Sequence, residues 1–184
     1  MSVLPIYTFG TNVLRTKALP VKKVNDEIIK LIIDMFDTMR NAGGIGLAAN
    51  QVGVLRRVIV LDLSGVEGME KFEPLALINP VIIEQEGGWR AEEGCLSIPD
   101  VRDEVERSES ITIQYKDANF RDNEMNANGL VARVILHEID HLNGVLFIDH
   151  LPNTRKRLHK GALKLIQRAE FEVTYPVVTS SITV

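Results

Sequence analysis

The stretch Ile135-Leu136-His137-Glu138-Ile139-Asp140-His141-Leu142-Asn143-Gly144 places two imidazoles on one side of a predicted helix, with a carboxylate beside them. Residues i and i+4 of a helix share a face, so the rings of His137 and His141 can bind one metal ion. Glu138 lies about 60 to 100° around the helix from that pair, within reach of a water molecule beside the ion without being a ligand. The pattern His-Glu-x-x-His therefore predicts a hydrolytic metal centre.

The helix that carries this motif is expected to be buried. It is predicted to begin near Asn128-Gly129 and to end at Leu142, and its sequence is apolar on nearly all sides. Such a helix packs against sheets and does not lie on a surface. The alternative to metal binding is a pair of ordinary core histidines. Leu130 and Val134, on the same face, offer the rings no hydrogen-bond partner, which favours the metal.

Length and composition indicate one globular domain over residues 1–184. The chain has 184 residues, of which 45% are hydrophobic and 25% charged, which suits a sizeable core. A net charge of −4 argues against nucleic acid as the substrate. No basic segment precedes a long apolar run at the start, and no window approaches about 18 apolar residues, so we expect a cytoplasmic protein without membrane contact. The single cysteine, Cys95, fits a reducing compartment.

The pattern along the chain predicts an α+β fold, with antiparallel β-sheets packed around the central metal-binding helix and a further helix near the C-terminus. Residues 1–23 are irregular, and Asn25 is expected to cap a helix that ends at Gly43-Gly44. The last helix is predicted from a cap at Asn153 to about Glu170, and residues 171–184 are unassigned. Extended segments are predicted over residues 57–63, 75–84 with a break at Asn79-Pro80, 95–98 ended by Pro99, 101–106, 111–115 and 120–125.

A catalytic zinc-type site needs a third protein ligand, and its source decides the class of enzyme. In the metzincin pattern a third histidine follows six residues after the second, but Phe147 stands there, so that class is excluded. His150 and His159 lie in polar surroundings beyond the helix, as exposed histidines commonly do. Glu170 on the last helix would give a His/His/Glu zinc metallopeptidase, which is the alternative function.

Cys95 is the favoured third ligand. It is the only thiol in the chain, and the neighbouring Gly94 lets another backbone segment approach closely. A thiolate with two imidazoles is a known catalytic zinc set. A further alternative is a module that a metal stabilises but that has no open coordination position and no activity.

The segment Gly44-Ile45-Gly46-Leu47-Ala48-Ala49 formally matches a dinucleotide-binding fingerprint. It follows a helix instead of a strand, and too few residues separate it from the next strand for a crossover helix. Dinucleotide binding is therefore excluded. The glycines serve either a tight packed connection or a wall of the active site, where bare backbone binds a peptide and Gln51 contributes an amide donor.

Three stretches together resemble, in the same order, the three motifs of the peptide deformylase family. They are Gly44 to Gln51, Glu93-Gly94-Cys95-Leu96-Ser97 and His137-Glu138-Ile139-Asp140-His141-Leu142. The resemblance covers about residues 4–150 and departs at Leu136, where the family usually has glutamine. It implies hydrolysis of the formyl group from the N-terminal formyl-methionine of newly made bacterial or organellar polypeptides, with release of formate.

The resemblance also implies a role for each site residue. Glu138 would transfer protons, and the metal, the Gln51 amide and the backbone N–H of Leu96 would stabilise the developing oxyanion. The native metal of the family is generally Fe²⁺, and Zn²⁺, Ni²⁺ or Co²⁺ can substitute. The metal ligands would be Cys95, His137 and His141. The substrate contacts would be Ile45, Gly46, Leu130 and Val134.

The last predicted helix is strongly basic. One interpretation is a solvated face. In the resembled family such a helix is implicated in docking near the ribosomal exit tunnel, which suits a nascent chain as substrate. The sequence thus favours a weak, salt-sensitive ribosome contact as a hypothesis. The cations concerned are Arg155, Lys156, Arg157, Lys160, Lys164 and Arg168.

Overall fold

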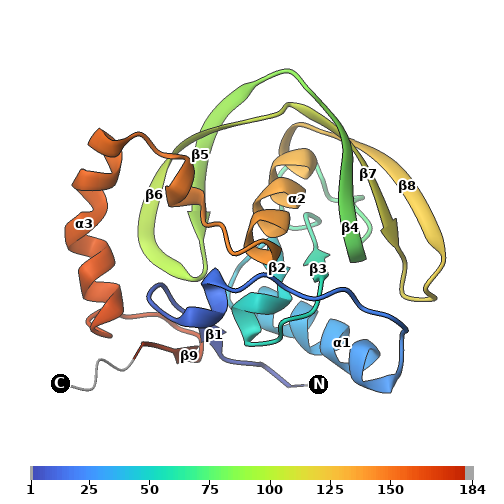
Figure 1. Cartoon of the computed structure of the whole chain (residues 1–184), viewed down its shortest axis with the longest axis horizontal. Coiled ribbons are helices and arrows are strands. Elements are labelled where there is room, and N and C mark those ends of the chain that lie inside the picture. The colour runs from blue at the N-terminus through green and yellow to red at the C-terminus, as the bar shows by residue number, and fades with distance from the viewer. Residues whose placement is uncertain (1, 181–184) are drawn as a thin grey trace.

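A computed structural model describes residues 2–180 of the chain. Its central element is α2 (Gly129–Leu142), which carries the His-Glu-x-x-His motif. A five-stranded antiparallel sheet covers one side of this helix, and a two-stranded hairpin lies on the other side (Figure 1). This arrangement confirms the predicted α+β fold with antiparallel sheets around the metal-binding helix.

The five-stranded sheet and the helices on its two faces form much of the core. In sheet order, its strands are β2 (Gly46–Ala48), β3 (Val58–Leu61), β4 (Leu75–Glu86), β7 (Ser110–Lys116) and β8 (Asp122–Asn128). Ile59 and Leu61 of β3 pack with α2, whereas Val58 and Val60 pack with α1 (Asp26–Asn41), because alternate residues of a strand face opposite sides. The strand that the sequence predicts as buried is thus covered on both faces by helices.

The ends of the two core helices follow the sequence signals. Oδ1 of Asn25 accepts a hydrogen bond from the N–H of Ile28 at 3.1 Å, which confirms the predicted cap of α1. At the end of α2, Gly144 has a φ of +76°, and a Cβ there would lie 2.6 Å from the backbone oxygen of Arg15. Only glycine fits at this position, so Gly144 lets the N-terminal segment cross the end of the metal-binding helix.

The hairpin consists of β5 (Trp89–Cys95) and β6 (Ile98–Arg107). The prediction of a short extended segment over residues 95–98, ended by Pro99, was wrong, because these residues form the turn and Pro99 lies inside β6. A register shift beside the turn leaves Pro99 without a ladder partner, so its missing N–H is tolerated. Strand β5 was not predicted because charged residues interrupt its apolar pattern.

Irregular elements complete this part of the chain. The break predicted at Asn79-Pro80 is confirmed as a β-bulge in β4, where Asn79 has a φ of +53° and the register with β7 shifts. Short 3₁₀ turns occur at Asn12–Arg15, Ala49–Val52 and Phe147–His150.

Within residues 2–180, no helix combines the length and the apolar character needed to span a membrane.

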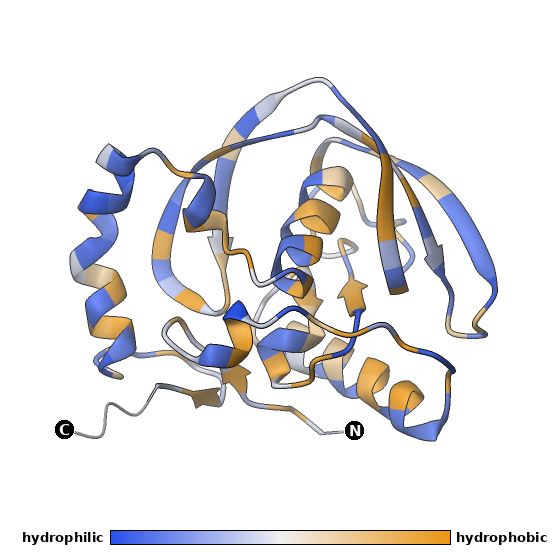
Figure 2. Cartoon of the chain, viewed as in Figure 1, coloured by the Kyte–Doolittle hydropathy of each residue, from blue (hydrophilic) through white to orange (hydrophobic). Residues whose placement is uncertain are grey.

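Helix α3 (Asn153–Gln167) packs against β6 at the edge of the molecule. Its bounds correct the prediction in two ways. Pro152 is the N-cap, so Asn153 is the first helical residue and makes no side-chain cap. The helix also ends before Glu170. Figure 2 shows α3 as largely hydrophilic, in contrast to the apolar α2, because only one stripe of α3 faces the hairpin.

The unassigned tail returns to the start of the chain. Strand β9 (Val177–Val178) pairs in parallel with β1 (Ile6–Tyr7), so segments from the two ends of the sequence lie side by side (Figure 1). The N–H of Ile6 donates to the carbonyl of Pro176 at 2.9 Å, and the N–H of Thr8 donates to that of Val178 at 2.9 Å. Residues 181–184 of the predicted tail lie outside the described residues.

Asp103 of β6 connects the hairpin to α3 and makes stability dependent on pH. Its carboxylate accepts a hydrogen bond from Nη2 of Arg155 at 2.8 Å and pairs with Nε2 of His159 at 2.6 Å. The hydrogen bonds from Arg155, with a smaller contribution from His159, lower the pKa of Asp103 to about 2. A lowered carboxyl pKa stabilises the fold above the unfolded-state value of about 3.9, and this contribution is lost as the pH falls toward 2.

We therefore expect Asp103→Asn to lower the free energy of unfolding at pH 7 by about 1 to 2 kcal/mol, because half-exposed Arg155 is partly screened by solvent. The difference from the wild type should shrink as the pH falls below about 4, as measured by urea unfolding across the pH range. The matched control Asp122→Asn, in an exposed pair with Lys116, should change stability little. A deficit that stays constant down to pH 3 would contradict this assignment.

Candidate metal centre

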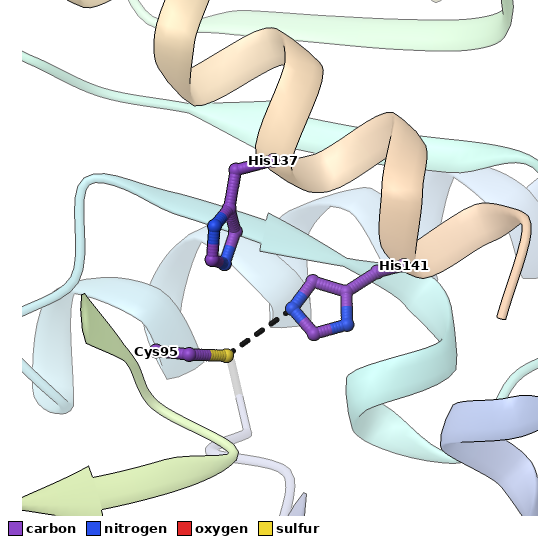
Figure 3. Close-up of side chains that lie close together, drawn as sticks. All are labelled: Cys95, His137 and His141. Atoms are coloured by element: carbon purple, nitrogen blue, oxygen red, sulfur yellow. Dashed lines mark hydrogen bonds between the residues drawn. The ribbon is translucent and has the colours of Figure 1, made fainter. Parts of the chain in front are cut away.

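Three donor atoms from two elements converge beside α2. Cys95 is the last residue of β5, and His137 and His141 lie one helical turn apart on α2. Sγ of Cys95 is 3.2 Å from Nε2 of His141, and one donor atom from each of the three residues lies within 4.8 Å of the others. Figure 3 shows the sulfur and both rings facing one small space. The structure thus brings together the three predicted ligands.

This donor set fits a divalent metal ion. Donors about 2.0 to 2.3 Å from one ion lie roughly 3.5 Å apart in tetrahedral geometry. Sγ of Cys95 and Nε2 of His141 are 3.2 Å apart, and all three donors lie within 4.8 Å of one another, so the cluster is compatible with such an ion. Both histidines are buried, and burial lowers the pKa of His141 well below its usual value, which favours the neutral imidazole that binds metals. The residues therefore suit a site with three protein ligands and a free position for chemistry.

The alternative ligands lie elsewhere. Nε2 of His150 is 2.7 Å from Asp140, and Nε2 of His159 is 2.6 Å from Asp103. Glu170 is exposed beyond the end of α3 and does not belong to the cluster that could hold a metal in the described part of the chain. The His/His/Glu metallopeptidase hypothesis therefore lacks its third ligand.

Behind the metal ligands lies a buried charged cluster that the sequence did not reveal. Oε2 of Glu93 is 3.0 Å from Nδ1 of His137, while Oε1 accepts hydrogen bonds from Nε of Arg107 at 2.5 Å and Nη1 of Arg133 at 2.6 Å. Burial alone would raise the pKa of Glu93, but His137 and Arg107 outweigh it and lower the pKa to about 2. The carboxylate therefore fixes His137 with Nδ1 as the donor and leaves Nε2 for the metal.

Glu138 lies on α2 beside these ligands. Its carboxyl group is buried, Oε2 has no hydrogen-bond partner within the described residues, and burial raises its pKa to about 7. The backbone of β2 approaches so closely that a Cβ at Gly46 would lie 2.6 Å from Oε1 of Glu138 and 2.7 Å from Cγ1 of Val134. Gly46 is therefore needed for the close packing of β2 on α2, and it also lines the cavity beside the metal centre, whereas its binding of a peptide backbone stays a prediction.

Gln51 directs its amide toward the cysteine-bearing turn. Its Oε1 accepts a hydrogen bond from the N–H of Ala48 at 2.8 Å, so its Nε2 points the other way. Nε2 donates to Oγ of Ser97 at 3.1 Å and lies 3.6 Å from Sγ of Cys95. The side chain is thus a fixed donor at the edge of the metal centre.

A cavity of about 600 Å³ opens onto this centre. Leu136 does not line it and is buried in the core between α2 and the sheet, so the departure from the family pattern adds no group to the cavity. The C-terminal segment Val173–Tyr175 does line it, which the sequence did not predict. The predicted site residues among its lining are Ile45, Gly46, Gln51, Cys95, Leu96, Leu130, Val134, His137 and Glu138.

The fold and the site together define a metal-dependent hydrolase, with two histidines on a buried helix and a cysteine from a hairpin turn. A family model described as polypeptide deformylase matches residues 3–157. The chain belongs to the polypeptide deformylase family.

Individual relatives agree with this assignment. A peptide deformylase of Chlorobium phaeobacteroides is 47% identical over 175 residues, which is 95% of each chain. One of Salinibacter ruber is 45% identical over 185 residues, covering 96% of this chain and 95% of the relative. A crystal structure of a peptide deformylase from Legionella pneumophila has a TM-score of 0.84 at 37% identity, covering 92% of this chain and 98% of that chain.

Proposed function

We propose that this protein hydrolyses the formyl group from the N-terminal formyl-methionine of newly made polypeptides and releases formate. The observation that carries the proposal is the convergence of Cys95, His137 and His141 beside the buried carboxyl group of Glu138. A bacterial cytoplasm suits both a thiolate ligand, which needs a reducing compartment, and a substrate that emerges from the ribosome.

The proposed reaction is the addition of water to an amide. A divalent cation held by Cys95, His137 and His141 would supply Lewis-acid activation of water and of the formyl oxygen. Glu138 accepts the proton of the attacking water, whose oxygen bonds to the formyl carbon. When the C–N bond breaks, Glu138 donates the proton to the nitrogen of the leaving methionine, so that one buried carboxyl group serves both steps. Its pKa of about 7 suits both accepting and donating a proton.

The neighbouring backbone and side chains orient the substrate. Nε2 of Gln51 and the N–H of Leu96 donate hydrogen bonds to the developing oxyanion. Strand β2 is at the edge of its sheet, so the backbone at Ile45 and Gly46 can pair with an extended peptide. Leu130 and Val134 line the cavity, and in this proposal they form the pocket for the methionine side chain.

The native ion in this proposal is Fe²⁺. One thiolate and two imidazoles also accept Zn²⁺, Ni²⁺ or Co²⁺, so the donor set allows substitution. Metal analysis of protein purified without oxygen should find about one iron ion per chain. Stoichiometric zinc in such a preparation, together with full activity, would assign zinc instead.

The test of the function is formate release from a formyl-Met tripeptide by the metal-loaded protein. We expect one formate for each free amino terminus formed, and no acetate from the matched acetyl-Met tripeptide. A peptidase would cleave internal bonds of the unformylated peptide. Internal cleavage without formate release would refute the proposed function.

We further propose a weak ribosome contact through α3. Arg155 and His159 are bonded to Asp103, and Nζ of Lys156 donates a hydrogen bond to the carbonyl of Asp149 at 2.8 Å. The remaining cations of α3 and its C-cap residue are therefore the ones proposed to make this contact. They are Arg157, Lys160, Lys164 and Arg168. Exposed cations of this kind attract phosphate groups of RNA in a salt-dependent way.

Reversing three of these charges, in the variant Arg157→Glu, Lys160→Glu, Lys164→Glu, should weaken ribosome pelleting by about tenfold at low salt. Point changes are preferable to deleting residues 153–184, because the deletion also removes the buried Ile166 and the tail at the active site. The control reverses three exposed cations elsewhere, namely Lys22, Lys23 and Lys71. Equal pelleting of both variants would refute a contact through α3.

A further inference from the structure

The chain beyond α3 returns to the metal centre. This segment lies outside the residues that the family model matches, which end at 157. Val173, Thr174 and Tyr175 nevertheless line the cavity. The hydroxyl group of Tyr175 donates a hydrogen bond to the carbonyl of Leu96 at 2.8 Å, across a sequence separation of 79 residues. The tail thus contacts the turn that follows Cys95.

Leu96 and Ser97 are the central residues of this turn, which is closed by the pairing of Cys95 with Ile98. The peptide unit between the two central residues of a β-turn has two common orientations, which distinguish type I from type II. The carbonyl of Leu96 belongs to this unit. A hydrogen bond to that carbonyl therefore favours one orientation of this unit and restrains ψ of Leu96. The N–H of Leu96 belongs to the preceding peptide unit and is joined to this carbonyl through the same Cα, so a fixed carbonyl limits the rotation available to that N–H.

Other contacts hold the far side of the same turn. The N–H of Phe9 donates to the carbonyl of Ser97 at 2.8 Å, and Nε2 of Gln51 donates to Oγ of Ser97 at 3.1 Å. These bonds fix Ser97, which is fully buried. The hydrogen bond from Tyr175 is the contact that reaches the Leu96 carbonyl, so it completes the restraint of the turn.

Tyr175 is itself fixed by the pairing of β9 with β1. The residue that follows it, Pro176, accepts a hydrogen bond from the N–H of Ile6 at 2.9 Å. Phe9, which holds Ser97, follows β1 on the same segment, so the tail, the N-terminal segment and the turn form one connected unit. Burial also raises the pKa of Tyr175 to about 12, so its phenol stays protonated and remains a donor.

We propose that Tyr175 is a positioning residue for deformylation, which holds the Leu96 backbone so that its N–H meets the developing oxyanion. The inference rests on the proposed function. An oxyanion donor is effective only when its position is fixed before the reaction. Because the charge on the formyl oxygen develops in the transition state, a looser donor lowers kcat and leaves substrate binding almost unchanged.

The test is Tyr175→Phe in the full-length, metal-loaded protein. This change removes the hydroxyl group and keeps the ring in the cavity wall. We expect kcat per bound metal ion to fall about tenfold, which is part of the roughly 100- to 1,000-fold loss typical of removing a whole oxyanion donor. KM for a formyl-Met tripeptide should stay within about twofold, and the metal content should not change. The matched control Tyr115→Phe, on β7 away from the cavity, should retain the wild-type kcat.

Each outcome decides the inference. A wild-type kcat in Tyr175→Phe would overturn it. A raised KM with unchanged kcat would also overturn it, because Tyr175 would then contact the substrate and not position Leu96. Loss of metal would assign Tyr175 to the support of Cys95 instead, which again refutes the proposal. If the wild-type protein released no formate, the proposed function itself would fail, so the two failures are distinguishable.

Discussion

Replacing Cys95 with alanine is expected to remove the bound metal and to lower formate release by at least about 1,000-fold. The two imidazoles of His137 and His141 are neutral ligands, so the thiolate supplies the negative charge of the donor set. Without it, a cation would be held only by two nitrogens in a largely buried site. Metal content after desalting and the rate of formate release measure the two effects.

The single cysteine also provides a direct readout of ligation. Because Cys95 is the only thiol in the chain, its rate of reaction with a thiol reagent reports on this site alone. The metal-loaded wild type should react more slowly than the metal-free protein, since a ligating thiolate is not free to attack. A Cys95→Ala variant that kept stoichiometric metal and full turnover would place the third ligand elsewhere.

The metal-binding helix could be predicted from sequence because its signals are local. Helical spacing places His137 and His141 on one face, and the apolar residues around them indicate burial on nearly all sides. Both inferences need only neighbouring residues and the geometry of the helix. The structure confirms the helix, its bounds near Gly129 and Leu142, and its burial. Cys95 was predicted because two ligands required a third and few residue types could provide it.

The surroundings of the metal could not be predicted in the same way, because they depend on contacts between distant segments. Glu93 meets its partners Arg107 and Arg133 only after β5, β6 and α2 have packed together. In the sequence, each of these residues has the pattern of an ordinary exposed charge. The same cluster explains why charged residues occur in β5, where they obscured the strand.

The position of the C-terminal tail beside the metal centre was harder still to predict, because the sequence around Tyr175 carries almost no local pattern for it. Strands β1 and β9 have two residues each and come from opposite ends of the chain. Parallel pairing over so long a separation leaves no periodic pattern that a sequence window can detect. Tyr175 therefore looked like part of an irregular tail, although it reaches the turn beside the metal ligand Cys95.

Replacing Glu138 with glutamine should lower kcat for formate release by about 1,000-fold or more while the protein keeps its metal. Glutamine has nearly the same shape as glutamate, but it can neither accept the proton of water nor return it to the leaving amine. His137 and His141 remain in place, so metal content should equal that of the wild type. The measurements are the rate of formate release and the metal content of the same preparation.

The stability of the Glu138→Gln variant is a second measurement, and unlike its activity it is not expected to fall. The carboxyl group of Glu138 is buried, and its Oε2 has no partner within the described part of the chain, so folding gains little from its charge. A neutral amide is less costly to bury, and we expect the unfolding free energy of Glu138→Gln to equal or exceed that of the wild type. The matched control Glu124→Gln, on the exposed surface of β8, should change neither activity nor stability. Retained turnover in Glu138→Gln would assign proton transfer to another group, whereas a marked loss of stability would show that this carboxyl group also supports the fold.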